Sequence, residues 1–262
     1  MPNPVPTTVI GPLGSTVHVL RADADTVAAL AAIDWNRRFR RVCVDPARGL
    51  ITLMSPSRLH EELATIFGDI VDVAAEILSG AGRSIGSTRL RGRGDPPDTG
   101  MEPDCAFYVG ESARAYGQAL REGEAAADTF LEQTPPDLVV EVEITNADAG
   151  KADRYADLGV REMWRLHGRK GSPDFEAEFL ALNPGESPQP LSASVVLEGL
   201  EPADVREAMN EARLGTTKSE RIEAVARVMR RRRQRIARIR EEAASYPTES
   251  SRTGTDVLIE SG

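Results

Sequence analysis

The sequence predicts an α/β protein in which helices flank a central mixed β-sheet. Apolar residues recur at helical spacing between residues 55 and 80, a pattern typical of an amphipathic helix that packs on a sheet. The segment from Leu138 to Ile144 is rich in β-branched residues and follows two prolines, as expected of a buried strand. A short helix is expected at 150–158, with further strands at 160–166 and 175–182, and such alternation favours one sheet covered by helices.

The other predicted elements surround this core. In chain order they are a loose arm (1–24), a short helix (25–33), a hairpin (41–54), an exposed loop or weak strand (82–100), a strand from Glu102, a mobile helical excursion (111–133), and helices at 201–212 and 219–242. We therefore expect a single sheet and four regions, namely an N-terminal arm, helix and hairpin (1–54), the core (55–215), a basic helix (216–244) and a disordered tail (245–262).

The composition excludes several classes of protein. Of 262 residues, 40% are hydrophobic and 28% are charged, which is typical of a globular chain. No stretch approaches the roughly 20 apolar residues of a membrane span, and the N-terminus lacks a signal-peptide pattern, so we expect a cytoplasmic protein with no membrane contact. Cys43 and Cys105 are the two cysteines, which argues against a disulfide framework and against a cysteine zinc site.

Positive charge is concentrated in short stretches, although the formal net charge is −9. Because phosphate contacts by Lys and Arg dominate the affinity for nucleic acid, any DNA contact must be local. The helix at 216–244 is a candidate for such a contact, and the acidic surface of a partner protein is an equal alternative. Its apolar side would also permit pairing with a second copy in a homodimer. The arginine clusters are Arg37, Arg38, Arg40 and Arg41; Arg89, Arg91 and Arg93; and Arg230 to Arg233 with Arg235, Arg238 and Arg240.

An acidic pair lies within the strongest predicted strand. Side chains alternate between the faces of a strand, so Glu141 and Glu143 project side by side. Burying unpaired anions is costly, and a divalent metal ion or the ammonium of Lys151 would neutralise them. Asp104 on a neighbouring strand would complete an oxygen-rich pocket suited to Mg²⁺ or Mn²⁺. Alternatively, the two glutamates line an exposed face and pair with arginines, and their spacing alone does not decide between these interpretations.

Three blocks of sequence carry a resemblance to a known family. They are 101–109 around Glu102-Pro103-Asp104, 136–145 around Glu141-x-Glu143, and 151–166, which begins at Lys151 and contains Gly-Val-x-Glu-x-Trp. In order and spacing they resemble the Uma-type restriction endonuclease family of the PD-(D/E)xK nuclease superfamily. The resemblance begins near Ser55, weakens toward Arg230, and implies a restriction-endonuclease-like core.

The resemblance also implies an activity and a set of roles. Asp104 and Glu141 would be metal ligands, Glu143 would position metal or water, Lys151 would replace a displaced lysine, and Tyr155 would orient or pack beneath it. Glu61 or Glu62 would tune the site. These roles imply a Mg²⁺-dependent endonuclease, a hydrolase that cleaves DNA phosphodiester bonds.

The sequence departs from the signature at Glu143, which stands where a lysine is expected. The alternative function is therefore a catalytically inactive nuclease fold that binds nucleic acid or a protein, and a third is an interaction protein that works through its basic C-terminal helix. For residues outside the signature, structural roles are favoured. We expect His60 at a solvent position at a helix start, with a phosphate or water contact as the less favoured alternative. We expect His18 and His167 at the surface, and Trp164 and Cys105 in the core.

Overall fold

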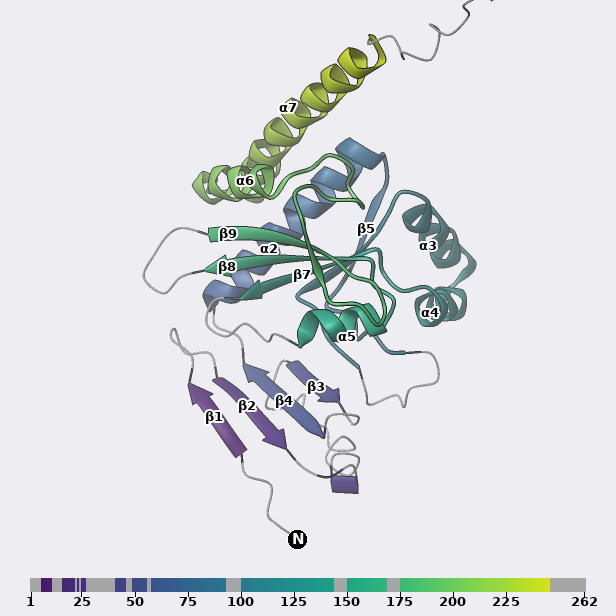
Figure 1. Ribbon diagram of the computed structural model, residues 1–262, viewed down its shortest axis with the longest axis vertical. Helices are drawn as coiled ribbons and strands as arrows, with labels where there is room; N and C mark the ends of the chain where they lie inside the picture. Colours follow the sequence, from purple (N-terminus) through teal and green to yellow (C-terminus); the bar gives the residue numbers. More distant parts are fainter. Residues whose placement is uncertain are drawn as a thin grey trace, which may run out of the picture.

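The computed structural model describes residues 6–10, 16–21, 23, 25–26, 41–45, 49–55, 58–92, 100–143, 150–168 and 175–245. These residues form two β-sheets and several helices (Figure 1). None of the helices in these ranges combines the length and the hydrophobicity that a membrane crossing requires. The predicted tail at 245–262 lies outside the described residues except for Ser245, which ends the last helix.

The larger sheet has six strands and is mixed. Adjacent strands of this sheet pair antiparallel, except that β7 and β8 are parallel to each other. A parallel pair needs a crossover connection, and the short helix α5 (Lys151–Asp157) lies in it. The α/β class with a mixed sheet is thereby confirmed. The strand order is β10 (Gln189–Leu191), β9 (Phe175–Ala181), β8 (Glu162–Gly168), β7 (Leu138–Glu143), β6 (Cys105–Val109) and β5 (Gly82–Gly86), of which β10 was not predicted.

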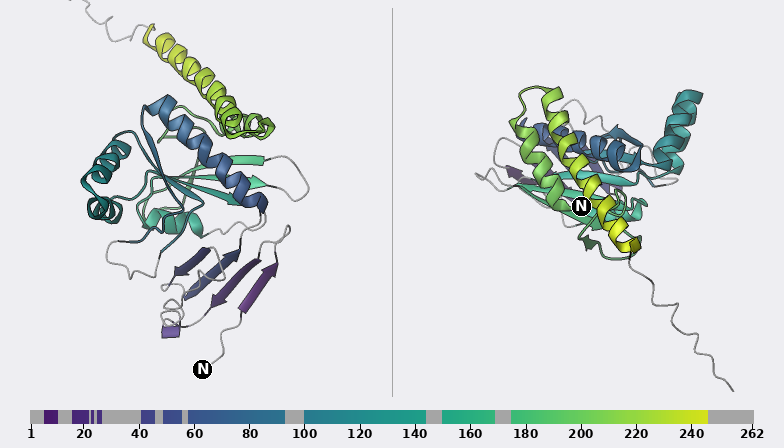
Figure 2. Two further views of the ribbon diagram at one scale, coloured as in Figure 1. Left: turned by 180° about the vertical axis from the view of Figure 1, so that it is seen from behind. Right: turned by 90° about the horizontal axis from the view of Figure 1, so that it is seen from above.

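Helices cover both faces of this sheet (Figure 2). On one face, α2 (Arg58–Ala74) lies against the strands, and α6 (Pro202–Leu214) and α7 (Lys218–Ser245) pack beside it. The other face carries α5 and a smaller apolar cluster. Two more helices, α3 (Glu111–Glu122) and α4 (Glu124–Gln133), form the predicted helical excursion between β6 and β7.

Helix α2 confirms the clearest prediction from periodicity. Leu63, Phe67 and Ile70 recur at intervals of three and four residues and are buried against the sheet, which places the apolar stripe toward the core. A single π-helical turn (η3, Ala75–Ser79) extends the helix, and Gly80 ends it with a φ of 70°. A residue with a side chain is strained at that φ, which explains glycine at this position.

The N-terminal region contains a second sheet, so the expectations of a loose arm and of a single sheet were wrong. The predicted hairpin is confirmed as β3 (Arg41–Asp45) and β4 (Leu50–Ser55), which pair antiparallel. Two earlier strands, β1 (Pro6–Ile10) and β2 (Thr16–Arg21), pair with each other, and β2 pairs with β4. This pairing satisfies backbone groups that an isolated hairpin would leave open. Most of the short helix expected at 25–33 lies outside the described residues.

The helix α7 buries the apolar side that had suggested pairing with a second copy. Val225, Val228 and Met229 are almost fully buried in the chain's own core with α2 and α6. Its exposed large apolar residue is Ile239, near the end of the helix. The apolar side of α7 therefore holds the helix to its own chain.

An aromatic stack joins β8 to β9, and a buried carboxylate joins β8 to the segment around Val195. The Trp164 ring stacks on Phe179 with centroids 4.1 Å apart, and its indole N–H donates to Glu162 Oε1 at 2.5 Å. The other oxygen, Glu162 Oε2, accepts from the backbone N–H groups of Val195 and Val196 at 2.9 and 3.0 Å. Glu162 is fully buried, and these three hydrogen bonds compensate its desolvation.

Two substitutions of Trp164 are expected to separate packing from hydrogen bonding. Trp164→Ala should lower the free energy of unfolding by about 3–5 kcal/mol because it opens a cavity and removes the donor to Glu162. Trp164→Phe retains much of the packing. It should lower the free energy of unfolding by about 1–3 kcal/mol, because one carboxylate oxygen of Glu162 loses its donor. Urea unfolding measures both values. Equal losses of stability in the two variants would contradict a distinct contribution from the hydrogen bond.

Candidate functional site

The candidate residues meet where β6 begins, β7 ends and α5 starts. The antiparallel register pairs Cys105 with Val140, and one further step places Asp104 opposite Glu141. Lys151 is the first residue of α5. The fold therefore brings Asp104 against the end of β7, thirty-eight positions along the chain at Val142, and brings Lys151 back against Glu141 of the same strand.

Asp104 is fixed between β7 and α2. Its side chain is fully buried, and Oδ2 accepts a hydrogen bond from the backbone N–H of Val142 at 2.6 Å. His60 Nε2, from the first turn of α2, lies 3.3 Å from the same oxygen. The solvent position expected for His60 was wrong, because His60 is buried against Asp104.

Glu141 has both carboxylate oxygens engaged by α5. The side chain is 1% exposed, the hydroxyl of Tyr155 donates to Oε1, and the ammonium of Lys151 pairs with Oε2. The prediction that Lys151 folds back over the strand is confirmed. Tyr155 is fully buried, and its hydroxyl fixes the orientation of Glu141.

Glu143 lies on the same face but has weaker partners. Its carboxylate is 4.0 Å from Arg165 Nε and 3.4 Å from His167 Nδ1, and neither oxygen accepts a hydrogen bond from the described residues. Burial raises the pKa of Glu143 above its ordinary value, although Arg165, His167 and Lys151 oppose the shift. The surface assignment of His167 was incomplete, because this half-buried ring also lies 3.3 Å from Glu178.

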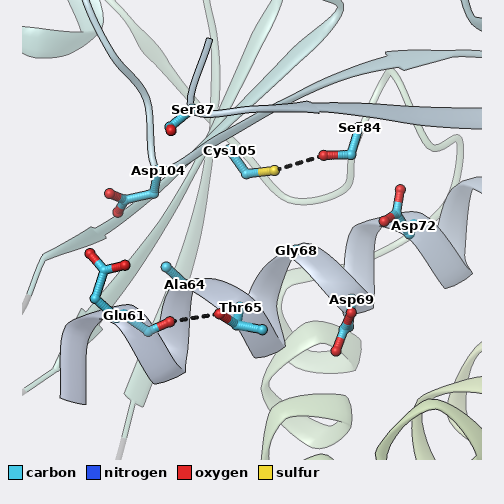
Figure 3. Close-up of a pocket in the computed structure, with 10 residues that line it drawn as sticks. All are labelled: Glu61, Ala64, Thr65, Gly68, Asp69, Asp72, Ser84, Ser87, Asp104 and Cys105. Atoms are coloured by element: carbon cyan, nitrogen blue, oxygen red, sulfur yellow. Dashed lines mark hydrogen bonds between the residues drawn. The ribbon is translucent and has the colours of Figure 1, made fainter. Parts of the chain in front are cut away.

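An acidic pocket opens beside Asp104, between α2 and β5 (Figure 3). Its volume is about 270 Å³. The carboxylate of Glu61 points toward that of Asp104 in Figure 3, whereas Glu62 is exposed, which favours Glu61 as the helix acid near the site. Cys105, predicted to be buried, hydrogen bonds to Ser84 in this wall, with Sγ and Oγ 3.1 Å apart. The complete lining is Glu61, Ala64, Thr65, Gly68, Asp69, Asp72, Ser84, Ser87, Asp104 and Cys105.

These residues have the oxygen ligands that suit a divalent ion, but they are not arranged as a complete metal site. Among the described residues, no three His, Cys, Asp or Glu side chains converge in an arrangement that could hold a metal. Mg²⁺, however, commonly uses one or two protein carboxylates together with water and substrate phosphates. Asp104 and Glu141 supply oxygen ligands of that kind, and the desolvated carboxylate of Glu143 would gain from a nearby cation. The three-carboxylate metal site remains a prediction.

The coupling between Glu141 and Lys151 can be measured with four proteins. Lys151→Met should lower the free energy of unfolding by about 3 kcal/mol because it leaves the buried Glu141 charge uncompensated. Adding Glu141→Gln should recover most of this loss, since Tyr155 can still donate to the amide oxygen. Urea unfolding of the parent, both single variants and the double variant, without divalent ions, gives the coupling energy. Additive single effects would contradict the pairing.

The raised pKa of Glu143 predicts how stability depends on pH. The folded protein holds the Glu143 proton more tightly than the unfolded chain, in which the pKa of this carboxyl has its ordinary value of 4.5. Parent stability should therefore fall as the pH rises from that value through the raised pKa, and remain lower above it. Glu143→Gln removes this loss, so the variant should be more stable than the parent at neutral pH and similar near pH 4. Thermal unfolding across this range tests the sign, and a variant less stable at neutral pH would contradict it.

Comparison with known proteins identifies the family. A family model named Uma2, described as "Putative restriction endonuclease", matches residues 38–177, which is more than half of the chain. The match begins before the region expected from sequence and ends before α6. It includes Asp104, Glu141, Glu143 and Lys151. No match was found among the curated proteins. The chain has the restriction-endonuclease-like α/β fold, and it belongs to the Uma2 family.

Proposed function

We propose that this protein is a metal-dependent endonuclease that hydrolyses DNA phosphodiester bonds. Family membership supports a nuclease role in general. The observation that carries the specific proposal is the buried carboxylate of Glu141, which is held by Lys151 and Tyr155 on the strand whose Val142 N–H also binds Asp104. A buried acid, a paired ammonium and a neighbouring acid are the groups that phosphodiester hydrolysis uses to place a cation and stabilise an oxyanion.

Asp104 and Glu141 would hold Mg²⁺ or Mn²⁺, and Glu143 would help to position the ion or a water molecule. When bound, the ion would lower the pKa of a coordinated water and neutralise charge on the scissile phosphate. The protein itself fixes the orientation of these ligands. The Val142 N–H and His60 hold one oxygen of Asp104, and Tyr155 holds one oxygen of Glu141. Such contacts restrict the ligand to one geometry before substrate arrives.

Lys151 has two roles in this proposal. It neutralises Glu141 in the structure described above, and its side chain is 18% exposed, so the ammonium lies at the boundary of the solvent. A scissile phosphate bound near Asp104 would compete with Glu141 for this cation. Lys151 would then stabilise the negative charge that develops on the phosphorus-bound oxygens.

A non-catalytic binding module is the second candidate, and two observations favour it. Glu143 stands in the place of the signature lysine, and the described carboxylates do not converge as a group of three. In this alternative, the pair formed by Lys151 and Glu141 stabilises the fold, and nucleic acid or a partner protein binds elsewhere on the surface.

Isosteric substitutions can test the endonuclease proposal without large structural loss. Asp104→Asn and Glu141→Gln remove the ligand charge but retain an acceptor oxygen for Val142 and Tyr155, respectively. We expect each to weaken Mn²⁺ binding at least tenfold in calorimetry and to reduce cleavage of plasmid DNA at least a hundredfold. The matched control is Glu62→Gln, which removes the same charge from an exposed position on α2 and should bind and cleave as the parent does.

Each result distinguishes the two candidates. Parent protein that binds Mn²⁺ and cleaves plasmid DNA, with both activities abolished in the two site variants alone, supports the endonuclease. Folded parent protein that cleaves neither plasmid nor single-stranded DNA with Mg²⁺ or Mn²⁺ would refute the proposed reaction and favour the binding module. Equal cleavage by the parent and the two site variants would refute the assigned residues.

A further inference from the structure

The distal part of α7 carries a dense positive charge that the proposed catalytic site does not use. Between residues 227 and 245 the helix has eight arginines and two glutamates, whereas the whole chain has a formal net charge of −9. The largest of the three arginine clusters thus lies on one helix of an acidic protein. All of these arginines except Arg232 are exposed.

Some of the arginines anchor the helix to the core. Arg232 is buried, donates from Nε to the carbonyl oxygen of Gly199 at 2.7 Å, and pairs with Glu201 and Asp204. Ile236 packs so closely on Gly199 that a Cβ there would lie 2.8 Å from its Cδ1. These contacts continue the buried apolar side of α7, so the helix is held in a fixed direction where it extends beyond α6 (Figure 1).

Other arginines form a row on the outer side of the helix. Arg227, Arg231, Arg235 and Arg238 are spaced by four, four and three residues, which places them along one side. We call these four residues the basic row. Arg231 pairs with Glu207 at 2.5 Å, and no described residue forms an ion pair with the other three. Exposed guanidinium groups in a row match the repeated phosphates of a nucleic acid.

We propose that the basic row binds the phosphate backbone of a nucleic-acid duplex. This inference rests on the proposed function, which makes DNA the substrate and therefore the duplex that the row would bind. Because the rest of the chain is strongly acidic and repels polyanions, contacts with phosphates would concentrate where arginines gather. The row lies on the α2 side of the sheet, away from Glu141, so it would hold DNA flanking the scissile phosphate and contribute to binding rather than to the chemical step.

The chemistry of the outer side favours nucleic acid over another protein. Besides the basic row, Gln234 and Glu242 fall on this side by their helical positions. Ile236 packs on Gly199, and Ile239 is the one exposed large apolar residue of the helix among the described residues. A protein interface needs an apolar centre depleted of charge, which this row does not provide. Phosphate recognition needs donors and positive charge, which it does provide.

The test uses Arg235→Gln/Arg238→Gln in the full chain. Both residues are exposed, and glutamine sustains a helix well. The matched control, Arg114→Gln/Arg121→Gln, removes two exposed arginines from α3. Binding of a fluorescent duplex of about 20 base pairs is measured by anisotropy in EDTA at several salt concentrations, so that cleavage does not interfere. Circular dichroism verifies that each variant retains its helix content.

We expect the basic-row variant to bind the duplex at least tenfold more weakly than the parent at low salt. The slope of log K against log salt should become shallower by roughly 0.9 for each phosphate that the variant no longer neutralises. The control should resemble the parent in both respects. Equal affinities and slopes for the two double variants would overturn the proposal.

Two other results would also overturn it by assigning the row to a different partner. Polyglutamate that displaces the duplex as effectively as unlabelled DNA of equal charge would indicate an acidic protein. A parent dimer in sedimentation that the basic-row substitutions dissociate, with duplex affinity unchanged, would indicate a second copy of the chain.

Failure of the proposed endonuclease is distinguishable from failure of this inference. If the parent does not cleave DNA but its binding depends on the basic row, hydrolysis is refuted and the basic row stands. If the parent cleaves DNA through Asp104 and Glu141 but the basic-row variant keeps the parent KM and duplex affinity, the basic row is refuted and the endonuclease stands.

Discussion

The buried charge of Glu141 is the constraint on which the candidate site depends. A carboxylate at 1% exposure in the middle of a mixed sheet is stable only where a cation and a donor meet it. Lys151 and Tyr155 supply these groups from successive turns of α5. The crossover helix is therefore bound to β7 by polar contacts as well as by its apolar side, and the parallel strand β8 follows from the same connection. Polar contacts thus hold the crossover helix against the strand that precedes it.

The sequence predicted the elements whose signals are local. Strand β7 and helix α2 have strong periodicity, and the contact between Lys151 and Glu141 requires a chain reversal of ten residues. The predicted environment was wrong for His60 and incomplete for His167, because the contacts of each residue depend on how distant elements are aligned. His167 lies opposite Glu143 in the parallel pairing of β7 with β8, and His60 reaches Asp104 across forty-four positions. The early strands β1 and β2 were missed for a related reason, since short strands depend on partners such as β4 that lie far along the chain.

Helix α7 illustrates how one amphipathic pattern can serve two purposes. Its apolar side suggested a partner helix, and the structure fills that side with α2 and α6 of the same chain. The desolvated contact of Arg232 with Gly199, Glu201 and Asp204 then fixes the rotation of the helix about its axis. Once this rotation is fixed, the positions four, four and three residues apart must face solvent. The direction of the basic row is therefore a consequence of core packing.

The charges around Glu143 provide an electrostatic argument about the lysine exchange. Asp104, Glu141 and Glu143 bring three carboxylates to one end of the sheet, and the permanent cations paired with them are Lys151 and Arg165. Moving the cationic group from the strand to α5 allows β7 to hold a second acid, but it leaves these five groups with an excess of negative charge when all are ionised. Burial disfavours the charged form of Glu143, and this raises the pKa of its carboxyl above the ordinary value. A divalent cation near these carboxylates would reduce the excess of negative charge. In the proposed endonuclease, the exchange that departs from the nuclease signature would favour a metal ion beside Glu143, because a lysine at position 143 would repel the ion that a glutamate attracts.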